Sequence, residues 1–355
     1  MKISVRQICF ILIFYTAVTK LLQYPTLLSS YSGRDLLFSS LLSFIIQGVV
    51  IWAVAYLSSK TDKTLYELIK DTFGEVTARI IYGFFAAFFI LMALLPLFEQ
   101  KAFVHAVFYD TTPALIVFLP IFFFIVYTGS KGFKNIGRCA DICMPIFLLI
   151  MLGIFAMSLA EVKFCNLLPV LKTPITNVLG GSLKSAYYFL EPAYLLMFLG
   201  HYKYRRGDAA KLTLSYVGGA LIVLAFLAVF YGIYAEIASS RQFAISKTSL
   251  YFSAIDLVGR IDLMALYVLE IVMLFALVLN IQLAVHCIIK CSGWDCPEII
   301  SLCVNFALAL LLYIFDHKYM AIQTFYADWL WIAVIIFATV APICAWALKR
   351  RKNES

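Results

Sequence analysis

The chain alternates between long apolar runs and short polar segments, and the apolar runs are close in length to a membrane-spanning helix. A helix needs about 20 apolar residues to cross the hydrocarbon core of a bilayer. The pattern therefore predicts ten transmembrane helices, of which the fourth is short and the eighth long: residues 8–28, 36–57, 80–104, 114–128, 142–160, 181–199, 212–234, 262–289, 298–315 and 328–348.

The expected fold is an all-α membrane protein, because the runs are continuous and lack the period-two alternation of a transmembrane barrel. The polar segments between the runs are short, which predicts one transmembrane domain over residues 1–355. Segments 64–73 and 246–258 carry enough apolar positions to form interfacial helices. The first run is too long for the core of a signal peptide and contains Lys20, so we expect it to be retained.

Composition and charge support this class and suggest an orientation. Hydrophobic residues make up 63% of the chain and charged residues 14%, whereas about a quarter of the residues in a soluble domain are charged. Lys and Arg are about twice as frequent in the segments on the side of the N-terminus as in the opposite ones, which predicts cytoplasmic N- and C-termini. This excess also explains the net charge of +8. It would attract anionic membrane lipid and requires no nucleic acid partner.

Neither a metal site nor a catalytic motif is expected. The nine cysteines form no CxxC pair and no clear combination with histidine, so we interpret them as buried free thiols. No phosphate-binding loop, zinc-protease motif or nucleophile elbow is present in a usable context. The sequence therefore indicates a protein that is not an enzyme and binds no cofactor.

Three ionisable residues lie deep inside predicted spans, where a charge costs about 2.5–3.5 kcal/mol to insert. Lys20 lies near the middle of the first span, and Glu191 is followed directly by Pro192 in the sixth. Both are candidates for a functional site. Glu270, in the eighth span, fits helix packing nearly as well as transport. Glu99 and Lys101, at the end of the third span, are interpreted as an ordinary interfacial pair.

Two similar interruptions suggest an internal repeat. The first span contains "TKLLQYP" (19–25) and the sixth contains "YYFLEP" (187–192), each with a polar residue shortly before a proline. Five spans per half would make residues 8–160 and 181–348 an inverted repeat, with helices 1 and 6 broken near Gln23–Pro25 and Phe189–Pro192. Paired broken helices mark the midplane site of many secondary transporters. The alternative is that both prolines only kink packed helices.

The broken helices predict a ligand-binding cavity between the first and sixth spans, with contributions from the third and eighth. An aromatic and polar lining suits a small zwitterion. We expect Lys20 and Glu191 to form an ion pair in the ligand-free state; in the rival geometry Lys20 faces Glu270, and Glu191 is protonated alone. The expected ligand-binding residues are Tyr15, Thr19, Lys20, Gln23, Tyr24, Tyr187, Tyr188, Glu191 and Tyr194, and the candidates for proton coupling are Glu191 and Glu270.

Four segments, in this order and at this spacing, resemble the B subunits of spore-germination nutrient receptors. They are "SGRDLLFSSLLS" (32–43), "LYELIKDTFGE" (65–75), "KGFKNIGRCADICMPIF" (131–147) and "CNLLPVL" (165–171). The similarity extends over effectively the whole chain. "FLE" (189–191) is similar to a Phe-Gly-Glu motif of that family, with Leu190 in place of glycine. The first span contains no glycine, which makes Lys20 a possible replacement for backbone recognition of a carboxylate.

The resemblance implies a ten-helix, permease-like fold of the amino acid/polyamine/organocation superfamily with a LeuT-like inverted repeat. It also implies a subunit that binds a nutrient in the inner spore membrane together with receptor A and C subunits. The alternative function is a stand-alone proton-coupled amino acid permease, in which Glu191 or Glu270 takes up the proton.

Overall fold

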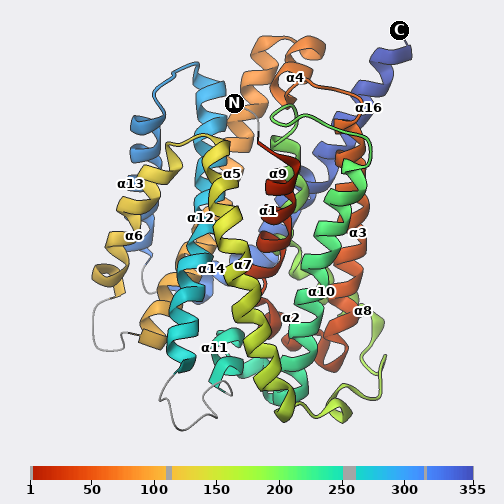
Figure 1. Ribbon diagram of the computed structural model, residues 1–355, viewed down its shortest axis with the longest axis vertical. Coiled ribbons are helices and arrows are strands. Elements are labelled where there is room, and N and C mark those ends of the chain that lie inside the picture. Colours follow the sequence, from red (N-terminus) through yellow and green to blue (C-terminus); the bar gives the residue numbers. More distant parts are fainter. Residues whose placement is uncertain (1–2, 109–113, 251–260, 316–317, 355) are drawn as a thin grey trace.

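The protein is a bundle of helices that run roughly parallel to its long axis (Figure 1). The structure is a computed structural model that describes residues 3–108, 114–250, 261–315 and 318–354. Seven of the described helices are long and apolar enough to cross a membrane: Tyr24–Ser58, Glu75–Val107, Phe133–Glu161, Asp208–Ser240, Ala265–Ser292, Pro297–Ile314 and Tyr319–Ala347. The chain is therefore a multi-pass membrane protein.

Each of the ten predicted spans coincides with helical structure. The helices that make up the first nine predicted spans are, in chain order, α1 (Val5–Val18), α2 (Tyr24–Ser32), α3 (Leu36–Ser58), α5 (Glu75–Phe108), α6 (Ala114–Gly129), α7 (Phe133–Ser158), α8 (Ile175–Lys184), α9 (Glu191–Met197), α10 (Asp208–Tyr234), α12 (Ile261–Ser292) and α13 (Pro297–Ile314). The last span consists of α14 (Tyr319–Phe325), α15 (Trp331–Val334), α16 (Ala341–Glu354) and two intervening π-helical turns.

Three of the ten predicted spans are missing from the seven long apolar helices, for different reasons. The first and sixth are each divided by a break, which leaves the pieces α1, α8 and α9 too short to cross alone. The fourth corresponds to α6, which has 16 residues. A helix of that length spans about 24 Å, below the roughly 30 Å of a hydrocarbon core.

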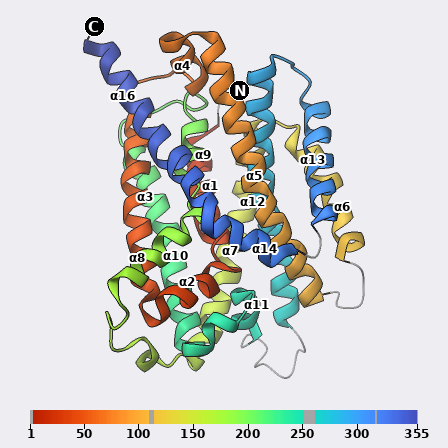
Figure 2. The same ribbon diagram turned by 180° about the vertical axis from the view of Figure 1, so that it is seen from behind.

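Both described ends of the chain lie at the same end of the bundle, together with the short helix α4 (Leu65–Phe73) (Figures 1 and 2). α4 confirms the helix expected over 64–73; Thr64 caps it, and Leu65 and Ile69 are its buried positions. At the opposite end lies α11 (Ala244–Ser249), which covers the start of the helix expected over 246–258. Residues 251–258 of that expectation lie outside the described residues.

The core of the bundle is organised around α12, α5 and the pair formed by α1 and α10. α12 packs along α5, and 83% of its most apolar 18-residue stretch is buried. α1 packs closely on α10 at Gly219, where a Cβ atom would lie 2.8 Å from the carbonyl oxygen of Ile13 and 2.8 Å from Cβ of Thr16. Membrane helices commonly use small residues to approach this closely.

The cysteines are free thiols, but most of them are not buried. Cys287 is buried, whereas Cys139, Cys165, Cys296, Cys303 and Cys344 are exposed on the surface of the bundle. The expectation of buried thiols was therefore wrong for these five. Cys303 and Cys344 lie on apolar helices, where a small apolar side chain is as stable against lipid as against protein. Cys165 and Cys296 lie outside the long helices, in a turn and just before α13.

Candidate functional site

The first predicted span is broken at residues 19–23, between α1 and α2. Two backbone carbonyls of the broken segment find partners in α11. The amide of Ala244 donates to the carbonyl of Leu22 at 2.8 Å, and the amide of Ile245 donates to that of Leu21 at 3.1 Å. Such partners are required because the bilayer core offers no water to exposed backbone groups. α11 therefore stabilises the broken conformation.

The sixth predicted span is broken between the turn Ala186–Tyr188 and α9. Phe189, with φ −105° and ψ 74°, and Leu190 lie between these elements. The break in the sixth span begins at Phe189, as predicted. The break in the first span lies a few residues before the predicted 23–25. Pro192 occupies the first turn of α9, a position that suits proline because its missing N–H has no partner there. It starts a helix instead of kinking one.

Lys20 and Glu191 form the predicted ion pair across the two breaks. The Lys20 Nζ lies 2.6 Å from Oε1 of Glu191, and both side chains are 0% exposed. Lys20 also donates to the carbonyl of Thr16 at 3.4 Å. The rival geometry is wrong, since Glu270 is not the partner of Lys20. Two buried charges in contact offset much of the cost of removing each from water, whereas either one alone remains uncompensated.

Two aromatic rings flank the pair. The ammonium of Lys20 lies 4.4 Å from the ring centroid of Phe189 and 5.8 Å from that of Phe44. An ammonium over a ring face is attracted by the ring quadrupole. Oε2 of Glu191 and the hydroxyl of Tyr216 have no hydrogen-bond partner among the described residues. The carboxylate thus has capacity to accept one further donor.

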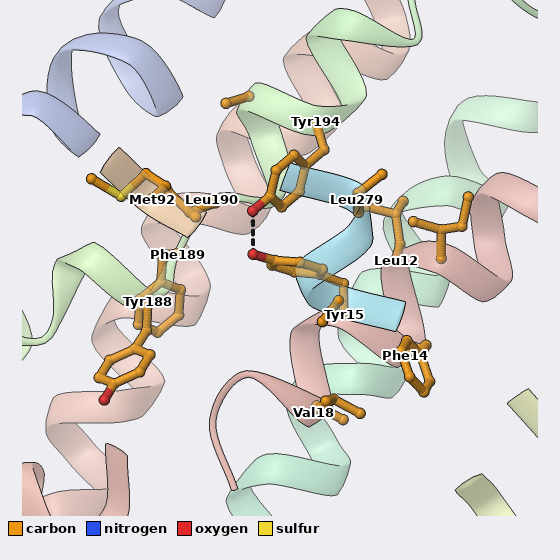
Figure 3. Close-up of a cluster of buried hydrophobic side chains, with 14 of the residues drawn as sticks. Leu12, Phe14, Tyr15, Val18, Met92, Tyr188, Phe189, Leu190, Tyr194 and Leu279 are labelled. Carbon is orange, nitrogen blue, oxygen red and sulfur yellow. Dashed lines mark hydrogen bonds between the residues drawn. The ribbon is translucent and has the colours of Figure 1, made fainter. Parts of the chain in front are cut away.

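A second polar connection joins α1, α9 and α12 beside the pair. The hydroxyl groups of Tyr15 and Tyr194 are hydrogen-bonded to one another, and the two rings meet edge to face (Figure 3). Tyr194 donates to Oδ1 of Asn280 at 2.6 Å, and Nδ2 of Asn280 lies 3.3 Å from the Tyr15 hydroxyl. The three side chains close a ring of hydrogen bonds, so each buried polar group is satisfied by the others.

A small cavity lies next to both breaks. The space open to the centres of water molecules is about 40 Å³, enough for about three waters. Thr19 and Leu190, the chain neighbours of the paired charges, form part of its wall. The remaining lining comes from α1, the first break, α5, α12, the Ala186–Tyr188 turn and the last span: Tyr15, Val18, Leu22, Met92, Leu95, Pro96, Glu99, Gln100, Tyr187, Tyr188, Met273, Ala276 and Tyr326.

The structure divides the predicted site residues into two groups. Tyr15, Thr19, Tyr187 and Tyr188 line the cavity, together with residues of the third and eighth spans, as expected. The other five do not line it. Lys20 and Glu191 bind one another, and Tyr24 donates to Ser40 at 2.8 Å. Tyr194 belongs to the hydrogen-bonded ring, and Gln23 is the residue that precedes α2.

Glu99 is the polar residue of the cavity that sequence reasoning misplaced. It is 3% exposed, and the hydroxyl of Tyr188 donates to its Oε1 at 2.7 Å. The interpretation as an interfacial pair with Lys101 was wrong, because α5 continues to Phe108 and Glu99 lies well inside it. One signal was present: like Lys20 and Glu191, Glu99 lies close to a proline within an apolar segment, here Pro96.

Glu270 lies apart from both the cavity lining and the ion pair. Its side chain is buried on α12, and neither carboxylate oxygen has a hydrogen-bond partner among the described residues. An isolated buried carboxylate is stable only when it is protonated or when it gains a partner in another conformation. It therefore remains a candidate for proton uptake.

No metal centre is apparent, since within the described ranges no group of three or more His, Cys, Asp and Glu side chains gathers to hold an ion. The site consists of two broken helices, a buried ion pair and a small aromatic cavity. This combination is that of a permease-like membrane protein.

Sequence comparison assigns the chain to a family. Residues 2–318 match the family model described as spore germination protein, and the chain belongs to this spore permease family. One similar curated protein is the putative spore germination protein YfkT of Bacillus subtilis (strain 168), 25% identical over 182 residues. The match covers 51% of this chain, and it spans about half of that relative's length.

Proposed function

We propose that this protein is the membrane subunit of a spore germination receptor that binds a small nutrient, most simply an amino acid. The observation that carries the proposal is the buried pair of Lys20 and Glu191, which joins two broken helices directly behind a small cavity. A zwitterion has one group for each partner. Its carboxylate would bind Lys20, and its ammonium would bind Glu191.

Ligand binding and conformational change are coupled in this arrangement. The cavity is too small for most amino acids as it stands, since ligand pockets commonly measure about 300–1,000 Å³. Insertion of a zwitterion between the charges separates the two helices that the pair holds together. A ligand that binds the separated state more tightly shifts the equilibrium towards it. The ion pair therefore stabilises the ligand-free conformation, and ligand binding breaks it.

We also propose a ten-span fold with two inverted halves, residues 8–160 and 181–348, in the spore inner membrane. The support is that the two breaks fall in the first span of each half and meet at one ion pair. Cysteine labelling of intact membranes tests the arrangement. Loops 59–64 and 200–207 should react from the cytoplasmic side, and loop 159–174 from the other; labelling of all three from one side contradicts it.

Receptor A and C subunits are the proposed protein partners, by family resemblance. The second candidate function is a proton-coupled amino acid permease, favoured by the isolated carboxylate of Glu270. The two functions differ in transport. Purified protein in sealed vesicles with an inward proton gradient should bind the ligand without net uptake if it is a receptor subunit, and uptake lost in Glu270→Gln identifies a permease.

The central experiment is equilibrium binding of a panel of amino acids to the purified protein in lipid nanodiscs. At least one zwitterion should bind, and Lys20→Ala and Glu191→Ala should each abolish binding while the protein still reaches the membrane. The control is Arg6→Ala, which removes an ion pair with Asp141 at 3.1 Å on the surface of the bundle. Normal binding by either test variant removes that residue from the site.

A further inference from the structure

A groove separate from the ligand cavity runs along the outside of the bundle between α6, α7 and α12. α12 contacts both other helices and forms its floor. The space open to the centres of water molecules is about 420 Å³, about ten times that of the ligand cavity. The wall is mostly apolar and includes Phe124, Ile271, Phe275 and Val278. A cavity of this size and composition on the side of a membrane protein can hold a hydrocarbon chain.

One end of the groove is basic. Lys131, in the connection between α6 and α7, and Arg138 in the first turns of α7 both line it, as does Asn135. Asn135 and Arg138 are three residues apart and therefore share a face of α7. Within the described part of the chain neither Lys131 nor Arg138 has a carboxylate partner. Two positive charges thus face this end with no carboxylate among the described residues to neutralise them.

The groove also contains a buried amide that lacks partners. Gln282, on the α12 floor, is 3% exposed, and neither its Nε2 nor its Oε1 has a hydrogen bond among the described residues. A buried amide without partners costs about 1–3 kcal/mol. The amide of Gln282 offers a donor to an ester carbonyl and an acceptor to a hydroxyl.

The length and direction of the groove fit one leaflet of a bilayer. Ile271 and Gln282 are 11 residues apart on α12, a rise of about 16 Å, and half of a hydrocarbon core is about 15 Å. The basic residues lie where α6 ends and α7 begins, at the end of the bundle that carries α4 (Figure 1). The apolar residues Ile271 and Phe275 precede Gln282 on α12, farther from that end.

We propose that this groove is a binding site for an anionic phospholipid. The phosphate lies on Lys131 and Arg138, the glycerol ester region contacts Gln282, and one acyl chain follows Phe275 and Ile271 along α12. A free phosphate ion would use only the basic end and leave the apolar channel unfilled. A zwitterionic lipid fits the channel but does not neutralise the two charges.

The test measures bound lipid on the full-length protein by native mass spectrometry. The protein is titrated with phosphatidylglycerol and with phosphatidylcholine of the same acyl chains. Wild-type protein should retain one phosphatidylglycerol with at least tenfold preference. Removal of each charge should weaken retention about fivefold, and Lys131→Gln with Arg138→Gln about 30-fold, since a basic side chain near the headgroups contributes about that factor. Glycerol phosphate should not compete at equal concentration.

Lys60→Gln is the matched control. Like Lys131, Lys60 follows the end of an apolar helix, and its ammonium lies over a tyrosine four residues earlier, at 5.4 Å compared with 4.8 Å for Lys131. It does not line the groove and should leave retention unchanged. Equal retention of the two lipids by wild type, or an equal loss in the Lys60 variant, overturns the proposal.

A second variant keeps the test valid if the basic changes impair folding. Ile271 is 55% exposed, so Ile271→Trp should not disturb the core. The larger ring fills the apolar part of the groove and should reduce phosphatidylglycerol retention at least fivefold with both charges present. Full retention in this variant shows that no acyl chain occupies the channel and contradicts the proposed site.

Discussion

At the scale of single residues, the energetics of the molecule centre on one buried ion pair. Lys20 and Glu191 are both 0% exposed and 2.6 Å apart. The pair was predicted from the sequence, because a charge inside a membrane span is costly unless it is paired with an opposite charge. The sequence did not predict that the ammonium of Lys20 would lie over the ring of Phe189 and that the pair would not line the cavity. Whether a side chain lines a cavity or is covered by a neighbouring ring depends on how the side chains pack, and the order of residue types along the chain does not determine that packing.

The first prediction concerns the stability of this pair. Lys20→Met should lower the free energy of unfolding by about 3–5 kcal/mol, because it leaves the carboxylate of Glu191 buried and uncompensated. The double variant Lys20→Met with Glu191→Leu should recover most of this loss, since it removes both charges. Thermal and denaturant unfolding in one detergent provide the comparison. As a control, Arg6→Gln at the exposed pair with Asp141 should cost less than about 1 kcal/mol. A double variant as unstable as the single one contradicts the pairing.

The second prediction separates the structural role of Glu99 from its charge. Glu99→Gln keeps an oxygen that accepts the hydrogen bond from Tyr188, so the free energy of unfolding should change by less than about 1 kcal/mol. An amide cannot ionise to pair with an incoming ammonium, so binding of an ammonium-bearing ligand should weaken about tenfold or more. Tyr188→Phe should instead destabilise the protein by about 1–3 kcal/mol, because Glu99 loses its donor. Unchanged ligand binding in Glu99→Gln excludes Glu99 from recognition.

At the scale of elements, the two breaks are stabilised by different means. The first depends on α11, whose backbone amides satisfy Leu21 and Leu22. The second depends on the turn before Phe189 and on the pair itself. The sequence located both breaks from their prolines, but it placed the first too far along the chain. Proline begins the following helix, so the break itself precedes it.

The third prediction follows from the position of Pro192. Because this residue starts α9 and donates nothing, Pro192→Ala should preserve the break and the ion pair. The cost should be about 0.4–1 kcal/mol, from the greater freedom of the unfolded chain. Unfolding measurements give the stability, and ligand binding reports the integrity of the break. A complete loss of binding in a folded variant contradicts the assignment of Pro192 as a helix start.

The fourth prediction tests the contact between α1 and α10 with two neighbouring glycines. Gly219→Ala places a Cβ 2.8 Å from the Ile13 carbonyl oxygen and should destabilise the protein by about 1–3 kcal/mol. A Cβ at Gly218 meets no atom within 4 Å, so Gly218→Ala should be neutral or slightly stabilising. The two variants have identical composition, and unfolding in the same detergent compares them directly. Equal stability of the two contradicts the close approach of the helices.

At the scale of the whole molecule, the sequence predicted ten helical segments because length and apolarity alone determine whether a segment is helical in lipid. It could not predict how much of each helix is enclosed by others. α12 is largely buried at the centre, yet its composition resembles that of α3, which exposes Trp52 to the outside. In a membrane both environments are apolar, so the usual contrast between polar surface and apolar core is absent.

The backbone hydrogen bonds from Ala244 and Ile245 couple the broken first span to the helix α11. α11 lies at the end of the bundle opposite α4, yet its amides hold residues directly after Lys20 in the chain. Displacement of that segment must either break both bonds or carry α11 with it. Because five of the six residues of α11 are buried, a shift of the broken segment must also repack the core at that end of the bundle.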